Sequence, residues 1–177
     1  MAAPFNRIRS KLNRAIVAYL IQKGCGTAAD TFPENSQAIK GYPVTTVRAG
    51  VAIPEPVLTG NRRVDILITV KGQALKDPNK PDDISTARVA FDNRLALVGD
   101  ALMQSDDGRT LRATAVLITA AGRALAVSDP EGNADMADFT VMLWLDAGEG
   151  DVSPDEQGTA WQEGLKFSAL CAPSNVD

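Results

Sequence analysis

Apolar side chains recur every three or four residues between Phe5 and Leu20. This spacing places them on one face of an α-helix. Pro4 suits the first turn of such a helix, and Gly24 suits the position just past its end. The pattern therefore predicts an amphipathic helix over residues 4–23. Residues 25–42, which lack a period and are rich in Gly, Pro, Asn and Ser, are predicted to form a long loop.

Apolar and polar residues alternate in several later segments, and this period of two predicts β-strands. It is clearest at 63–70, where Val64 begins the apolar series, and at 139–145. Weaker patterns predict a strand within residues 44–53 and a closing strand at 165–171. Residues 114–120 and 123–127 are predicted to form two further strands that pair through a turn at Ala121-Gly122.

A second helical period runs from Ile84 to Leu102, with Asp83 or Ser85 as the expected N-cap. The predicted order of elements is α-β-β-α-β-β, which favours an α+β fold: a mixed β-sheet with two main helices packed on one face. A chain of 177 residues fits a single domain. We expect this domain to carry long loops at about 25–42, 72–83 and 146–160.

Histidine is absent from the chain, which excludes Ser-His-Asp and Cys-His nucleophile systems and His-ligated metals. Catalysis would have to rest on carboxylates, Lys, Tyr or a bound metal. The acidic candidates are Asp92, Asp100 and the Asp106-Asp107 pair, while Asp82-Asp83 and Asp106-Asp107 both flank a predicted helix, where Asp is expected as a cap or turn former. Nothing assembles a nucleophile, a base and an oxyanion site. We therefore expect no enzymatic activity.

Two further segments have ligand-binding interpretations, each weaker than its structural one. Residues 24–29 match GxGxxA, but they follow a helix rather than a strand, so helix termination is favoured over dinucleotide binding. Residues 129–135 offer oxygen ligands for Ca²⁺ but lack the closing glutamate of an EF-hand, which favours a solvated acidic loop. No cofactor or metal is expected.

Charge is unevenly distributed behind the net value of −4. Residues 1–24 carry +5, residues 25–123 carry +1 and residues 124–177 carry −10. Opposite potentials on separate surfaces would favour head-to-tail contact between identical subunits, although two independently solvated faces are an equal alternative. The basic first helix could also contact DNA, but a solvated or protein-facing helix is favoured. The candidate assembly residues are Arg7, Arg9, Lys11, Arg14, Arg62, Arg63, Glu149, Asp151, Asp155 and Glu156.

Cys25 and Cys171 fit neither a zinc spacing nor a disulfide framework, which favours a reducing compartment. The longest apolar run, residues 15–21, is too short to cross a membrane. Because Gln22 and Lys23 follow it directly and continue the helical pattern, export is not expected either.

The layout of the chain resembles the tail terminator proteins of long-tailed bacteriophages. The resemblance begins with the amphipathic N-terminal helix and the stretch Glu55–Ile66, in which Leu58-Thr59-Gly60-Asn61 precedes a strand. It continues through a polar loop and a helix carrying Ala90-Phe91-Asp92-Asn93-Arg94 and Leu102. It ends with Trp161, Leu165-Lys166-Phe167 and Cys171-Ala172-Pro173.

The resemblance implies a structural virion protein that needs no cofactor. Such proteins form a ring, usually a homohexamer, which caps the head-proximal end of the tail tube, ends its polymerisation and docks the neck or head connector protein. DNA would pass through the ring without sequence-specific binding, and assembly would take place in the host cytoplasm with no membrane involved. Another neck or head-completion protein, or a tail tube protein, is the alternative. The loops at 25–42 and 146–159 are the expected binding elements, because long loops in a compact domain are often functional.

Overall fold

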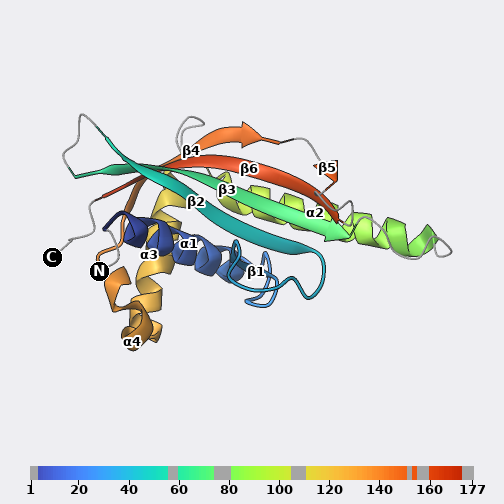
Figure 1. The fold of residues 1–177 in the computed structure, drawn as a ribbon, viewed down its shortest axis with the longest axis horizontal. Coiled ribbons are helices and arrows are strands. Elements are labelled where there is room, and N and C mark those ends of the chain that lie inside the picture. The colour runs from blue at the N-terminus through green and yellow to red at the C-terminus, as the bar shows by residue number, and fades with distance from the viewer. Residues whose placement is uncertain are drawn as a thin grey trace.

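A mixed β-sheet forms the centre of the molecule in the computed structural model (Figure 1). The structure describes residues 4–55, 60–73, 81–104, 111–150, 153–154 and 160–172, with the backbone alone at 4–7, 81–84, 149 and 154. The strand order is β1-β2-β3-β6-β4, and β5 pairs with β6 as well. Only the β1–β2 pair is parallel among these strands. The strands are β1 (Thr31–Pro33), β2 (Val44–Pro54), β3 (Arg62–Gln73), β4 (Val141–Glu149), β5 (Ser153–Pro154) and β6 (Ala160–Cys171).

Three long helices accompany the sheet, and the predicted α+β class is confirmed. The predicted first and second helices are present as α1 and α2. Because α2 begins at Pro81, Asp83 and Ser85 lie inside the helix, and their predicted role as its N-cap is wrong. The helices are α1 (Pro4–Gln22), α2 (Pro81–Leu102), α3 (Arg112–Ser128) and the short α4 (Pro130–Asn133), followed by the 3₁₀ turn η1 (Ala134–Met136).

Helix α3 replaces the two strands predicted at 114–120 and 123–127, and the turn predicted between them is absent. Its side facing the core includes Thr114, Ile118 and Gly122, which recur at helical spacing. Gly122 lies where α3 meets α1, since a Cβ placed there would come within 3.0 Å of the Ala15 Cβ. The third helix thus extends the predicted helical layer from two main helices to three.

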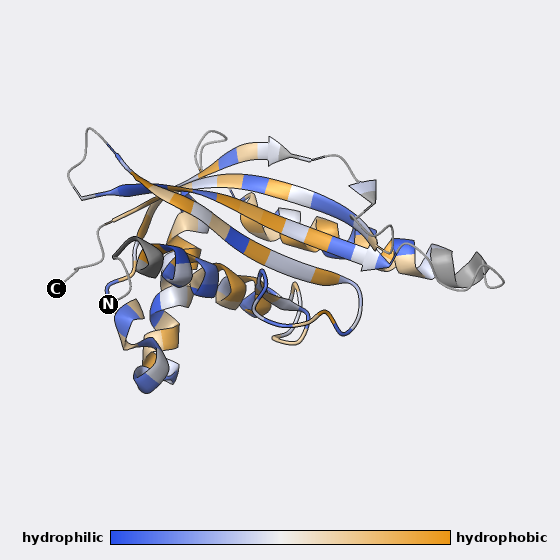
Figure 2. Cartoon of the chain, in the orientation of Figure 1, coloured by the Kyte–Doolittle hydropathy of each residue, from blue (hydrophilic) through white to orange (hydrophobic). Residues whose placement is uncertain are grey.

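The helices share one face of the sheet. Alternate residues of β3, from Val64 to Val70, are buried on this face (Figure 2). They join α1, α2 and α3 in a single apolar core that includes Leu12, Phe91 and Ile118. The indole ring of Trp144 stacks on Phe167 with the ring centroids 4.9 Å apart. The opposite face of the sheet carries none of these three helices.

The predicted loops are partly ordered into regular structure. Residues 25–42 include β1, which was not predicted. Strand β3 continues to Gln73 and α2 begins at Pro81, while residues 74–80 lie outside the described part of the chain. Of residues 146–160, the first four belong to the end of β4, and β5 follows at 153–154. No helix of the described residues is long and apolar enough to span a membrane.

Candidate assembly surfaces

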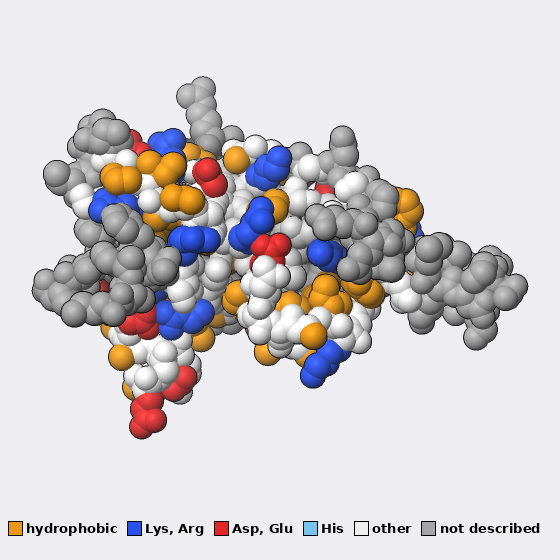
Figure 3. Space-filling view, viewed as in Figure 1, with side chains coloured by type: hydrophobic (Ala, Val, Ile, Leu, Met, Phe, Trp, Pro, Cys, Tyr) orange, Lys and Arg blue, Asp and Glu red, His pale blue; other side chains and the backbone are white. Residues whose placement is uncertain are grey.

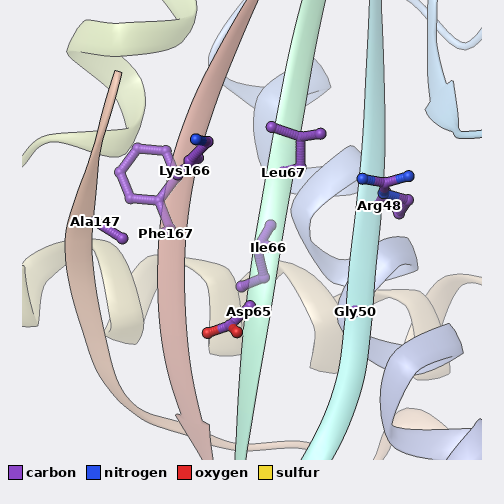
Figure 4. A pocket seen from close by; sticks show the side chains of 8 residues that line it. All are labelled: Arg48, Gly50, Asp65, Ile66, Leu67, Ala147, Lys166 and Phe167. Carbon is purple, nitrogen blue, oxygen red and sulfur yellow. The ribbon is translucent and has the colours of Figure 1, made fainter. Parts of the chain in front are cut away.

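The face of the sheet that points away from the helices presents alternating side chains from neighbouring strands. In the strand register, Leu67 of β3 lies between Arg48 of β2 and Lys166 of β6 (Figure 4). Asp65 lies two residues before Leu67 on β3, and therefore on the same face of the sheet. Arg48, Lys166 and Asp65 are exposed, and Leu67 is half-buried. We call this surface the bare sheet face.

A shallow groove of about 400 Å³ crosses the bare sheet face between these side chains. Leu67 leans over Gly164, where a Cβ would lie only 2.8 Å from its Cδ1 atom, so the glycine leaves room for the leucine. Farther along β2, Val51 and Ile53 are exposed by 70% and 54%. The groove therefore combines an apolar floor with charged walls, a composition typical of protein contact surfaces.

The basic side chains of α1 are largely engaged within the chain. Arg9 donates from Nε to the Ala49 carbonyl at 3.0 Å, and Asn13 Oδ1 accepts from the Ala49 N–H at 2.8 Å. Together they satisfy the backbone carbonyl and N–H groups of Ala49, on the edge of β2 beyond the point where β1 ends. These bonds protect an otherwise open strand edge. Arg7 belongs to α1, but its side chain lies outside the described part.

Arg14 joins α1 to the acidic segment after α3. It forms an ion pair with Asp135 at 2.7 Å and donates to Asn133 Oδ1 at 2.8 Å. Burial raises the pKa of Asp135, but hydrogen bonds from Arg14 and the charges of Arg14 and Lys11 outweigh burial, so this pKa lies below its ordinary value. Part of the opposite charge that we expected to join neighbouring copies is therefore paired within the chain itself.

Lys11 is one of the candidate assembly residues, but it does not lie on the solvent-exposed side of α1. Its side chain is buried, with only 5% exposed, beside the apolar residues of α1. A long lysine side chain can be covered in this way because its methylene groups tolerate apolar surroundings.

The other candidate interface residues lie along the strands or outside the described part. Arg62 and Arg63 begin β3, and Arg63 pairs with Glu55 across the β2–β3 hairpin at 3.3 Å. Glu149 ends β4, whereas Asp151, Asp155 and Glu156 lie outside the described residues. The acidic partner of α1 is Asp135, which was not among the predicted interface residues. Arg48 and Lys166 were also missed, although both occupy outward positions of strands and could have been found from the period of two.

The segment that follows α1 is held against α2. Gly24, with φ of 75°, ends α1 as predicted for the GxGxxA segment. Asp30 then accepts from both terminal nitrogens of Arg94, at 3.3 and 3.1 Å, and from the Thr27 N–H at 2.7 Å. Burial raises the pKa of Asp30, but these hydrogen bonds and the Arg94 charge outweigh it, so the pKa is lowered.

The Asp30–Arg94 pair predicts a pH dependence of stability. Because the folded-state pKa of Asp30 lies below its ordinary value of 3.8, the pair stabilises the fold above that pH, and the contribution is lost as the pH falls through the folded-state value. Asp30→Asn should therefore flatten the acid limb of a plot of unfolding free energy against pH. Urea titrations from pH 6 downward would measure this, with the exposed Asp138→Asn as the matched control. Equal acid limbs for wild type and Asp30→Asn would contradict the role of the pair.

Asp129 and Asp92, two of the acidic residues considered for chemistry, have local structural roles. Asp129 accepts from the Gly132 N–H and from the Asn133 side chain, so the predicted acidic loop is instead the capped start of α4. Asp92 pairs with Arg88 at 3.0 Å on the exposed side of α2. Asp106-Asp107 and the side chains of Asp82-Asp83 lie outside the described part. Within that part, no three His, Cys, Asp or Glu residues are placed to hold a metal ion.

Both cysteines are free thiols buried in the core. Burial raises the pKa of Cys171 to about 12 and also raises that of Cys25, despite the opposing charges of Arg94 and Lys23. Both side chains are therefore protonated and shielded from solvent near neutral pH.

No protein-family model matches the sequence, and a search of curated proteins found no significant match.

Proposed function

We propose that this chain is a structural protein of a bacteriophage particle, a tail terminator that forms a ring on the tail tube. The bare sheet face carries this proposal, because it presents an apolar groove with charged walls, and Val51 and Ile53, to solvent on the subunit alone. A surface of this composition is suited to contact with another protein. The choice of a ring on the tail tube as the particular assembly rests on the resemblance of the chain to tail terminators.

In this role the ring, most simply a homohexamer, caps the head-proximal end of the tail tube. It stops tube polymerisation and offers its other side to the neck or head connector protein. Genomic DNA passes through the lumen without sequence-specific contact. Because Arg9 and Arg14 are bonded within the chain, we do not assign α1 as a DNA-binding helix. The proposal requires no cofactor and no catalytic step.

A different structural protein of the same particle is the alternative. The bare sheet face would also suit a neck or head-completion protein, or a tail tube subunit that stacks in open arrays. These roles differ in the assembly that they produce, since a ring is closed and a tube continues to grow.

Light scattering coupled to size-exclusion chromatography, followed by electron microscopy of the peak, distinguishes these assemblies. The terminator role predicts a discrete mass at an integer multiple of the subunit and closed rings of that size. Open stacks of increasing length would favour a tube subunit. A monomer at every concentration, both alone and with tail tube protein, would contradict the proposal.

A further inference from the structure

Helix α3 has a second apolar face, opposite the one that joins the core. A surface helix normally carries polar residues there, and a helix that is apolar all round is normally buried. Val116 is exposed by 66% and Val127 by 82%. The helical period aligns the residues of this outer face along one side of α3: Ala113, Val116, Ala120, Ala124 and Val127.

The end of this outer face is acidic. Asp129, Glu131 and Asp138, in and around α4, are all exposed. Figure 3 shows acidic side chains at the end of the molecule formed by α4, while Lys and Arg side chains, with a few acidic ones among them, lie over the sheet and α1. Arg112 and Arg123 also lie beside the outer face, and Arg123 is bonded to the Phe139 carbonyl at 2.9 Å.

The bare sheet face has the opposite charge character. Arg48, Arg63 and Lys166 are exposed on it, with Asp65 among them. Arg48 contacts Glu34 at 3.4 Å and Arg63 contacts Glu55, but both arginine side chains remain more than half exposed. Its apolar groove and the apolar face of α3 are thus two uncovered surfaces, one edged mainly by cations and the other ending in acids.

We propose that the outer face of α3, together with α4, covers the bare sheet face of a second copy of this chain. One contact then buries both apolar surfaces and brings acidic side chains to basic ones. Because the two surfaces differ, the contact is head-to-tail and leaves one surface of each kind free until a ring closes. The inference rests on the proposed function for the closed ring, but the contact itself can be tested separately.

Site-specific crosslinking tests this contact. Val127→Cys and Lys166→Cys, carried on differently tagged full-length chains, are co-expressed and treated with a short bismaleimide. We expect crosslinked heterodimers from the mixture and none from either variant alone. Wild type controls for the two buried native thiols. Val89→Cys, at an exposed valine of α2 outside both surfaces, replaces Val127→Cys as the matched control and should give no product with Lys166→Cys.

Each outcome has a defined meaning when light scattering is run on the same samples and thermal unfolding shows that the variants fold. Homodimers from Val127→Cys alone would show a twofold α3–α3 contact and overturn the inference. Closed rings without the 127–166 product would overturn the contact but leave the terminator role intact. The 127–166 heterodimer from samples that form no rings would support the contact and contradict the terminator role. A monomer without any product would contradict both.

Discussion

Trp144→Ala should lower the free energy of unfolding by about 3–5 kcal/mol, the usual cost of truncating a large buried aromatic residue. The Trp144 side chain is fully buried and stacks on Phe167 with an interplanar angle of 25°. Its ring connects β4 and β6 on the core face of the sheet. In this close-packed interior, neither a polar group nor water can fill the volume lost on truncation without a further cost in free energy. Urea denaturation of the dissociated subunit would measure the change.

Trp144→Phe is the matched control. The indole Nε1 has no hydrogen-bond partner among the described residues, so phenylalanine removes an unpaired buried donor while keeping an aromatic ring against Phe167. The loss should therefore be much smaller than that of Trp144→Ala. Equal losses for the two variants would show that the stacked ring does not contribute as the structure indicates.

Lys166→Glu should weaken assembly by about tenfold or more, because an acidic residue on the bare sheet face would meet the acidic end of α3 and α4 on the neighbouring copy. About 1.4 kcal/mol of repulsion corresponds to that factor. Lys166 is exposed on the subunit, so its replacement should leave the unfolding free energy nearly unchanged. The concentration at which assemblies dissociate, followed by light scattering, measures the effect.

Lys23→Glu makes the same change of charge at another exposed lysine, which lies just past the end of α1 and outside the two loops expected to bind partners. It should leave the dissociation concentration within a small factor of wild type. If Lys23→Glu and Lys166→Glu weakened assembly equally, net charge rather than the bare sheet face would control association. If neither had any effect, the sheet face would not be the contact surface.

Elements with a clear period were predicted well from the sequence. The apolar face of α1 and the alternation around Val64 in β3 follow directly from burial on one side only. Helix α3 was mispredicted because Thr114, Val116 and Ile118 favour strands locally, and because exposed apolar residues such as Val127 extend the apolar pattern beyond the buried side of the helix. Strand β1 was missed because three residues are too few to show a period.

The charge pattern predicted an attraction but not its partners. Arg14 and Asp135 are far apart in the sequence, and only the packing of α1 against α3 brings them to 2.7 Å. Lys11, a candidate assembly residue, is buried in the folded chain. The bare sheet face could not be predicted from strand alternation, because alternation alone does not tell which outward side chains remain uncovered. It is recognised only when all three helices are seen on one side of the sheet.

Tube elongation tests the central claim most directly. Tail tube protein from the phage to which the proposal assigns this chain would be polymerised with and without the chain, and tube lengths and ends would be recorded by electron microscopy. The account predicts shorter tubes as the chain is added, each with a ring of fixed size at one end, and Lys166→Glu should require a higher concentration for the same shortening. Unchanged tube lengths with uncapped ends would contradict it.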